Sequence, residues 1–428
     1  MEDDRITHMD EGRLPDRFVR AGWLIDGGGG PVRENVLMEI DGGEVRALHR
    51  GSPPAVEGAE TIDFSDCTLL PGLVDCHVHL FMSATRDRRV RDHQLQAEFG
   101  DIRPVIDRHL RQHLAAGVVA VRDGGDRRGH TLRHKIECLP EQNLPLAVRA
   151  AGRAWRRSGR YGRLIARTPG RGCSLAEAIQ VDGEPVDHVK IVNSGLNSLV
   201  TFGRTTSPQF DPDELRAAVQ AAHRRGLKVM VHANGNRAVS VAVEAGCDSI
   251  EHGFFMGMET LRKMADRGTV WIPTAVTMEA YAEYLEDSGV LPPCFGGGRG
   301  SGETQRDAAR VARRNLEHQL EQMAAARRLG VTVALGTDAG SIGVEHGRGA
   351  AREFGLLMAA GFSPAQAVRC ASSNGARLLS LERLGRFGPG RPATFIAVEG
   401  DPSGLPRSLA RIRALVVDGR PWEEFDER

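Results

Sequence analysis

The sequence lacks paired cysteines, long apolar runs and an excess of charge of either sign. Its seven cysteines are scattered and never form a Cys-x-x-Cys pair, which argues against a disulfide framework or a thiolate zinc site and favours a reducing cytoplasm. Basic and acidic side chains number 56 each, so no net field favours nucleic acid or an anionic membrane. No apolar run reaches about 18 residues, the length of a membrane-spanning helix, and segment 1–5 lacks the apolar stretch of a secretory signal. We therefore expect a cytoplasmic protein that binds neither nucleic acid nor membrane.

Lysine is also scarce, because nearly all basic side chains are arginine. Its four positions are Lys135, Lys190, Lys228 and Lys263. Lys190 stands near the end of an apolar segment that has the pattern of a buried strand. With so few lysines in the chain, this position makes Lys190 a candidate functional residue.

The two ends of the chain share a pattern of short strands separated by glycine-rich turns. Near the N-terminus, Asp41-Gly42-Gly43 is a hairpin signal between two apolar segments. Near the C-terminus, segments 392–398 and 412–419 have strand patterns with no helical pattern between them. We expect the two ends to pair into one small composite β-sandwich domain, formed by residues 17–70 and 385–424.

The central segment, 71–384, alternates short apolar runs with helical patterns, which is typical of a parallel sheet in an α/β protein. About eight such units fit a (β/α)8 TIM barrel, whose active site lies at the carboxyl ends of the strands. The predicted strands are 73–79, 118–122, 145–150, 187–192, 228–232, 248–251, 269–273 and 331–336. A doubly wound open sheet is the alternative, but no Gly-x-Gly-x-x-Gly follows a predicted strand.

A pair of histidines marks the first strand of this central segment. After the Pro71-Gly72 turn, His77 and His79 lie in a short apolar run. Side chains at positions i and i+2 of a strand point to one face, so the two imidazoles can converge on one cation, for which imidazole is the commonest ligand. The motif is short and fits a pair of hydrogen-bonded core histidines as well as it fits a metal site. Other residues of the chain must therefore decide between these two interpretations.

Polar or charged side chains also stand at the tips of four later strands. They are Lys190, with His188 two residues before it, and His232, His252 and Asp338. A buried imidazole, ammonium or carboxylate costs several kcal/mol unless it is paired or bound to metal. One such residue alone is best explained as a satisfied core group, but the convergence of six on one end of a barrel favours a metal site.

These residue types define the chemistry that we expect. Imidazoles together with a carboxylate suit zinc or a similar divalent ion. Burial lowers the pKa of a lysine, and the neutral Lys190 amine can capture CO2 as a carbamate, an oxygen ligand able to bridge two metals. A hydroxide that bridges two metal ions is a nucleophile at neutral pH. Asp338 can bind one metal, accept the proton of the attacking water and pass it to the leaving group.

Several segments of the chain resemble the amidohydrolase superfamily. They are 71–79, Val189-Lys190-Ile191, 231–235, 250–253 and 336–340. They are most similar to its imidazolonepropionase-related branch, which includes prolidase-like dipeptidases and carboxypeptidases. The split β domain fits this branch, and segment 117–125 is similar to its second strand. The resemblance covers almost the whole chain and implies metal-dependent hydrolysis, whereas it is poorly specific for the substrate.

The resemblance assigns each ligand-type residue to one of two divalent ions, zinc in our prediction. The more buried ion would be held by His77, His79 and Asp338. The second ion would be held by His232 and His252. Lys190 would be the carboxylated lysine that bridges the two ions. Imidazolonepropionase itself lacks that lysine, so its presence favours a two-metal, peptidase-like site.

The chain departs from the family pattern where substrate contacts are expected. Dipeptidase-like members carry Gly-Gly-His-Gly after the Ala-Gly-Arg-Ala strand end, whereas this chain has Arg160 and Tyr161 in place of the Gly-His, and the stretch from Asn193 also differs. We predict Arg160, Tyr161 and Asn193 as substrate-binding residues, with Arg160 or Arg153 binding a carboxylate bidentately. Deaminases of the superfamily carry a glutamate at the position of Gly235, which argues against deamination.

Three functions fit these residues. The first is hydrolysis of an amide-type carbon–nitrogen bond at a two-metal site, in a dipeptide, an N-acyl amino acid or a urea- or carbamate-like compound. The second is a one-metal enzyme that opens a cyclic amide or lactone, with Lys190 an ordinary ammonium. The third is a catalytically inactive scaffold protein, against which the retention of all six ligand-type residues argues. For the first two functions we expect a small-molecule substrate. We also expect the protein to form a homo-oligomer.

Overall fold

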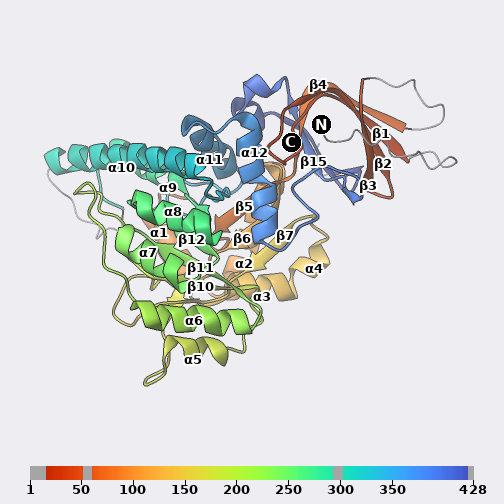
Figure 1. Cartoon of the computed structure of the whole chain (residues 1–428). Coiled ribbons are helices and arrows are strands. Elements are labelled where there is room, and N and C mark those ends of the chain that lie inside the picture. The colour runs from red at the N-terminus through yellow and green to blue at the C-terminus, as the bar shows by residue number, and fades with distance from the viewer. Residues whose placement is uncertain (1–15, 52–59, 293–301, 423–428) are drawn as a thin grey trace.

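The computed structural model describes residues 16–51, 60–292 and 302–422. Strands from both ends of the chain lie together at one end of the molecule (Figure 1). They form one eight-stranded sheet in the order β14-β3-β2-β1-β4-β15-β16-β17. Its strands are β1 Arg17–Leu24, β2 Arg33–Asp41, β3 Glu44–Arg50, β4 Glu60–Pro71, β14 Arg391–Pro392, β15 Phe395–Glu399, β16 Ile412–Val417 and β17 Arg420–Pro421.

The predicted β-sandwich is a single curled sheet in the structure (Figure 1). The 12-residue strand β4 joins its two halves, because β4 pairs with β1 in parallel and its last residues pair with β15 in antiparallel. The predicted hairpin joins β2 to β3. Gly42 and Gly43 at its turn have φ values of 56° and 81°, and a two-residue hairpin turn of this kind requires such positive values. The domain limits stay a prediction, and residues 52–59, 423 and 424 lie outside the described residues.

Between the end segments, short parallel strands alternate with helices. Strands β5, β6 and β7 pair in parallel in one sheet, and β10, β11, β12 and β13 pair in parallel in another. Their bounds are β5 Leu73–Val78, β6 Val118–Asp123, β7 Ala147–Ala150, β10 His188–Val192, β11 Lys228–Ala233, β12 Ser249–His252 and β13 Val270–Ile272. The short strands β8 Ala154–Trp155 and β9 Ala166–Arg167 extend the second sheet beyond β10.

Backbone hydrogen bonds link the two parallel sheets at both edges. At one edge, Asp187 directly before β10 donates its N–H to the carbonyl oxygen of Ala150 in β7 at 3.0 Å. At the other edge, the predicted strand 331–336 lies between β13 and β5. It forms a parallel bridge to β13 only at Val333, and the carbonyl oxygen of Leu335 accepts a 2.9 Å bond from a β5 N–H. Starting at β5, each parallel segment is therefore hydrogen-bonded to the next one, and the last segment is hydrogen-bonded to β5.

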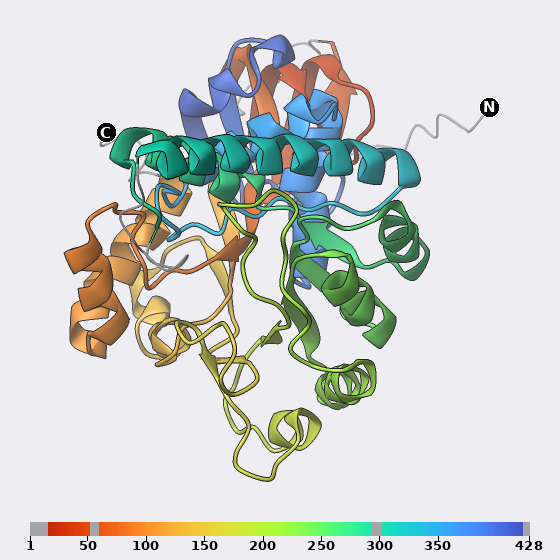
Figure 2. The same ribbon diagram turned by 90° about the vertical axis from the view of Figure 1, so that its left-hand side faces the viewer.

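Helices follow the parallel strands, and α5 to α8 lie beside β10, β11 and β12 (Figure 1). Helix α6 begins at Pro212, because the Asp211 side chain caps it by accepting two backbone N–H bonds. The long helix α10 runs across the face that Figure 2 turns toward the viewer. No helix in the described parts of the chain is both long and apolar enough to span a membrane.

The helix bounds are α1 Arg88–Gln96, α2 Phe99–Ala115, α3 His130–Glu137, α4 Leu139–Gln142, α5 Leu175–Gln180, α6 Pro212–Arg224, α7 Asn236–Ala245, α8 Met258–Arg267, α9 Ala275–Ser288, α10 Gly302–Leu329, α11 Arg348–Ala359, α12 Pro364–Ala371 and α13 Ser373–Leu378. Short 3-10 helices at Pro402–Gly404 and Arg407–Ala410 lie between β15 and β16.

The buried carboxyl group of Asp75 fastens β5 to the segment that precedes Asp338. Its Oδ2 accepts a 2.6 Å bond from Thr337 Oγ1, and its Oδ1 accepts N–H bonds from Thr337 at 3.0 Å and His77 at 3.2 Å. Asp75 is 0% exposed, so water cannot replace these bonds. One side chain therefore holds together the two segments that carry His77 and Asp338.

We expect Asp75→Ala to lower the free energy of unfolding by about 3 kcal/mol, because three buried donors lose their acceptor. Asp75→Asn is the matched control: its carbonyl oxygen can still accept both N–H bonds, so the loss should stay below about 1 kcal/mol. Urea denaturation followed by circular dichroism measures both values. Equal stability of Asp75→Ala and the parent chain would contradict this role.

Candidate metal centre

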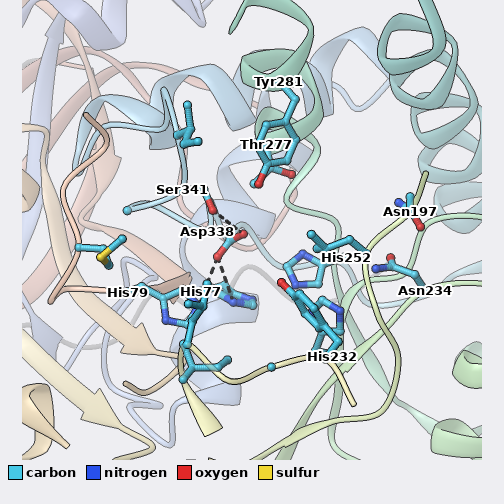
Figure 3. A pocket seen from close by; sticks show the side chains of 18 of the residues that line it. His77, His79, Asn197, His232, Asn234, His252, Thr277, Tyr281, Asp338 and Ser341 are labelled. Atoms are coloured by element: carbon cyan, nitrogen blue, oxygen red, sulfur yellow. Dashed lines mark hydrogen bonds and ion pairs between the residues drawn. The ribbon is translucent and has the colours of Figure 1, made fainter. Parts of the chain in front are cut away.

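His77 on β5 and His79 directly after it face the carboxylate of Asp338 (Figure 3). Oδ1 of Asp338 lies 3.5 Å from His77 Nε2 and 3.4 Å from His79 Nε2. The exposed fraction is 1% for the side chain of His77, 13% for that of His79 and 15% for that of Asp338. The strand spacing of two residues thus places both imidazoles on the same side, next to one carboxylate.

The other strand-tip residues approach the same place. The rings of His232 on β11 and His252 on β12 have centroids 4.5 Å apart, and the His252 centroid lies 5.0 Å from that of His77. Lys190 on β10 is 1% exposed. All six ligand-type residues line one pocket. The structure therefore brings together every residue for which the sequence predicts a metal-binding role.

Hydrogen bonds outside the pocket orient the two histidines of the first strand. His77 Nδ1 lies 2.7 Å from Glu251 Oε2, and His79 Nδ1 lies 2.9 Å from the carbonyl oxygen of Gly125. A carbonyl oxygen only accepts, so His79 carries its proton on Nδ1 and presents the lone pair of Nε2. The Nε2 atoms of both rings are those that face Asp338.

The second pair of histidines is oriented by hydrogen bonds in a similar way, and some residues of the site have strained backbones. His252 Nδ1 lies 2.7 Å from Thr274 Oγ1, and His232 Nε2 lies 3.4 Å from the carbonyl oxygen of Gly195. His252, Thr274 and Asp338 have φ values of 67°, 45° and 56°, in the left-handed region that costs free energy for residues other than glycine. Such strain is typical of functional sites.

Burial sets the protonation states in the pocket. It lowers the pKa of His79 to about 4 and that of His232 to about 3, because the charged imidazolium loses its hydration. The pKa values of His77 and His252 also fall well below the ordinary value, for the same reason. Neutral imidazole is the form that binds metal. All four histidines are therefore in the ligand form at neutral pH.

The same burial acts on Lys190 and Asp338. It lowers the pKa of Lys190 to about 8, so part of the population carries a neutral, nucleophilic amine near neutral pH. It raises the pKa of Asp338 to about 6, a value suited to a group that both takes up and releases protons. The shift of Lys190 is in the direction that the sequence predicts from burial.

Two buried atoms test whether this pocket fits a metal. His77 Nε2 and Lys190 Nζ are enclosed and have no hydrogen-bond partner among the described residues. Buried polar atoms almost always have a partner, so an orphaned one calls for an explanation such as an ion. Ligand atoms of His77, His79 and Asp338 all lie within 4.8 Å of one another. The donor set and its unpaired atoms fit a divalent cation.

The rest of the pocket is largely apolar. Its lining includes Phe81, Met82, Leu164, Ile165, Leu196 and Phe254. Besides the ligand-type residues, the polar lining includes Asn197, Asn234, Thr277, Tyr281 and Ser341 (Figure 3), together with Arg91 and Tyr161. A pocket of this kind suits a small molecule with an apolar part and a few polar contacts.

The predicted substrate residues have different places. Tyr161 lines the pocket, with its ring centroid 5.6 Å from that of His232. Arg160 does not belong to the lining; it is exposed and donates to the carbonyl oxygen of Ser207 at 3.0 Å. Arg153 is also outside the lining and is paired with Glu184.

Asn193 is fully buried. Its Nδ2 donates to the carbonyl oxygen of Ala238 at 3.1 Å, and its Oδ1 accepts from the N–H of Phe210 at 3.2 Å. It is not part of the pocket lining. The side chain therefore connects two segments of the chain, and its amide has no place facing a substrate in this structure.

Three residues that contact the site have no role in the sequence prediction. Ser341 Oγ donates to Asp338 Oδ2 at 3.0 Å, and Thr274 and Glu251 orient two of the histidines. Thr274 follows the seventh predicted strand, so the rule that singles out polar strand tips would have found it. Glu251 is a carboxylate inside an apolar strand, which is also a visible signal. Ser341 follows Asp338 in a loop, where no periodicity marks it.

Comparisons with known proteins agree on one family. The family model described as "Amidohydrolase family" matches residues 68–421. An uncharacterized protein of Mycobacterium tuberculosis is 28% identical over 413 residues, 96% of this chain and 94% of that protein. Imidazolonepropionase of Acidiphilium cryptum is 27% identical over 269 residues, 56% of this chain and 64% of that enzyme. The crystal structure of a Xaa-Pro dipeptidase with bound methionine superposes with a TM-score of 0.78 at 26% identity, covering 95% of this chain and 99% of that chain.

The pocket geometry predicts different effects for the neighbours Arg160 and Tyr161. Arg160→Met should leave KM within about twofold for any amide that the protein hydrolyses, whereas Tyr161→Ala should raise KM about tenfold, the usual cost of one lost pocket contact. Steady-state kinetics on a compound identified by hydrolysis screening measures both. A selective rise of KM for anionic substrates in Arg160→Met would instead place Arg160 at the substrate.

Proposed function

Because this chain belongs to the amidohydrolase family and is a hydrolase of carbon–nitrogen bonds, we propose that it cleaves an amide-type bond in a small molecule with two divalent metal ions, most simply zinc. The observation that carries the proposal is the convergence of six ligand-type residues in one pocket. Two of them, His77 and Lys190, present buried atoms without a hydrogen-bond partner among the described residues. The predicted superfamily and enzyme class are confirmed by the family match.

We assign one ion to His77, His79 and Asp338. The second is assigned to His232 and His252. Ions bound here would lower the pKa of a water molecule and polarise the carbonyl group of the substrate. The four imidazoles supply neutral nitrogen ligands, because burial keeps their pKa values low. The surrounding hydrogen bonds hold the rings in place before a metal binds.

Lys190 is proposed as the bridge between the two sites. Its neutral amine would add to CO2 and release one proton, which gives a carbamate with two oxygen ligands. Burial favours this step because it lowers the pKa of the amine to about 8. The orphaned Nζ supports the proposal, since a carbamate would satisfy it whereas a bare ammonium needs three acceptors.

Asp338 is proposed to move the proton. Its carboxylate would take the proton of the attacking water and give it to the departing nitrogen, which avoids the expulsion of an unprotonated amide anion. The pKa of about 6 suits both steps. The hydrogen bond from Ser341 Oγ to Oδ2 fixes the carboxylate so that Oδ1 faces the two histidines.

The substrate is proposed to be a dipeptide, an N-acyl amino acid or a urea- or carbamate-like compound. The similarity to a Xaa-Pro dipeptidase supports a peptide-like amide. The apolar lining around Phe81 and Phe254 supports an apolar group next to the scissile bond. Lys190 and the absence of a glutamate at Gly235 support hydrolysis of this kind over deamination.

A one-metal hydrolase of cyclic amides or lactones is the second candidate. One observation favours it: in the described part of the chain, His77, His79 and Asp338 are the only group of three or more His, Cys, Asp or Glu residues whose ligand atoms all lie within 4.8 Å of one another. The similarity to imidazolonepropionase agrees with it. Lys190 would then remain an ammonium.

We further propose that the parallel segments form a (β/α)8 barrel of residues 71–384, beside a β domain of residues 17–70 and 385–424. The hydrogen bonds that lead from β5 around to β5 support the barrel. The family match and the superposition on the dipeptidase agree with this fold. The site then lies at the carboxyl ends of the strands, where barrel enzymes carry their chemistry.

Elemental analysis separates the two candidates. Protein reconstituted with zinc and freed of excess metal should hold about two ions per chain and hydrolyse members of a dipeptide, N-acyl and carbamate library. About one ion per chain, with activity on cyclic amides or lactones, would support the second candidate. Removal of the metal with a chelator should abolish activity, and zinc should restore it. Full activity of the chelated protein would contradict both.

Lys190→Ala and Lys190→Arg test the bridge. Neither side chain can form a carbamate, so both variants should lose about one metal per chain and most of their activity. Lys190→Arg is the matched control for charge, because a merely structural ammonium would be replaced by its guanidinium. Added acetate or propionate should restore part of the activity of Lys190→Ala only. Retention of both ions in Lys190→Ala without added acid would refute the bridge.

A further inference from the structure

A buried carboxylate outside the pocket lining contacts the first of the proposed metal ligands. Glu251 of β12 is 0% exposed, and its Oε2 lies 2.7 Å from His77 Nδ1. Its other oxygen, Oε1, accepts hydrogen bonds from Arg122 Nη2 at 2.8 Å and from Ser249 Oγ at 2.6 Å. We propose that Glu251 is a positioning residue that fixes His77 in the tautomer able to bind metal through Nε2. This inference rests on the proposed function.

The direction of these hydrogen bonds follows from Arg122. A guanidinium is always charged and only donates, so Glu251 acts toward it as an accepting carboxylate. Arg122 is itself held in place: Nε donates to the carbonyl oxygen of Cys76 at 2.7 Å, and Nη1 donates to Ser249 Oγ at 3.0 Å. Glu251 Oε2 therefore accepts the Nδ1–H of His77. A neutral imidazole with its proton on Nδ1 has a free lone pair on Nε2.

The free-energy cost of burying this charged network argues that the network has a functional role. Arg122 and Glu251 are 3% and 0% exposed, and a buried ion pair often stabilises a fold no better than apolar residues of the same size. Among the hydrogen bonds that orient the four histidines of the pocket, only that of His77 goes to a carboxylate; those of the other three go to backbone carbonyl oxygens or a hydroxyl. A carboxylate partner both orients an imidazole and makes it a stronger ligand.

Glu251→Gln should reverse the tautomer. Two donors, from Arg122 and Ser249, point at the Oε1 position, so the glutamine carbonyl oxygen belongs there. Its NH2 group then faces His77 Nδ1 and turns that nitrogen into an acceptor. The ring proton moves to Nε2, which can no longer bind a metal without losing that bond. The side chain keeps its shape, so the change acts through hydrogen-bond polarity.

The experiment uses the full chain and two readouts that do not depend on activity. In metal-free protein labelled with 15N-histidine, NMR spectra report the tautomer of His77, with the signal assigned from a His77→Asn variant. Competition with a chelator measures zinc affinity. We expect the Nδ1–H tautomer in the parent chain, the Nε2–H tautomer in Glu251→Gln, and zinc binding about 10- to 100-fold weaker at the His77 site of that variant.

Ser249→Ala is the matched control. It removes one donor to Glu251 Oε1 but leaves the contact with His77, so tautomer and zinc affinity should stay close to those of the parent chain. If Glu251→Gln does not fold, the double variant Arg122→Met with Glu251→Leu replaces the ion pair by apolar side chains. This double variant also lacks the acceptor for the Nδ1–H of His77, so its zinc binding should be weakened as in Glu251→Gln.

The outcomes separate this inference from the proposed function. An unchanged tautomer and unchanged zinc affinity in folded Glu251→Gln, with normal zinc binding by the parent chain, would overturn the positioning role and leave the metal site intact. A parent chain that binds no zinc at His77 would overturn both. Equal losses of affinity in Ser249→Ala and Glu251→Gln would show a general packing effect and also overturn the positioning role.

Discussion

The polar side chains at the carboxyl ends of the parallel strands lose their contact with water on burial, and His77 and Lys190 show the consequence most clearly. Each presents a buried atom without a hydrogen-bond partner among the described residues, a state that costs free energy unless a bound group relieves it. The same burial keeps the imidazoles neutral and lowers the pKa of the Lys190 amine. The burial that makes these polar atoms costly is thus also what suits the pocket to cations and to a carbamate.

The remainder of the fold holds these side chains in position from outside. Gln319 of α10 donates to the carbonyl oxygen of His252 at 2.6 Å, where the backbone is strained. Glu353 of α11 accepts the first two N–H groups of α9, at 3.1 and 2.8 Å, and the residue before that helix is Thr274, which contacts the His252 ring. Helices distant in sequence therefore stabilise the backbone that carries the ligands, and strain at the site is offset by buried bonds elsewhere.

Much of the fold and of the ligand set was predictable because both depend on short-range patterns. Strand periodicity places His77 and His79 on one face, and polar tips on apolar runs single out Lys190, His232 and His252. Long-range geometry was not predictable: the joining of the end strands into one curled sheet depends on how β4 pairs along its length. The placement of the loop residues Arg160 and Asn193 depends on partners far along the chain, Ser207 and Ala238, which no local pattern reveals.

The central claim is that one pocket holds two ions joined through Lys190. A crystal structure of the zinc-reconstituted protein, with anomalous data collected on both sides of the zinc absorption edge, tests it most directly. The account predicts two anomalous peaks, one beside His77, His79 and Asp338 and one beside His232 and His252, with density for a carbamate continuing from Lys190 Nζ. A single peak beside His77 and His79, with Lys190 ending at its amine, would contradict it.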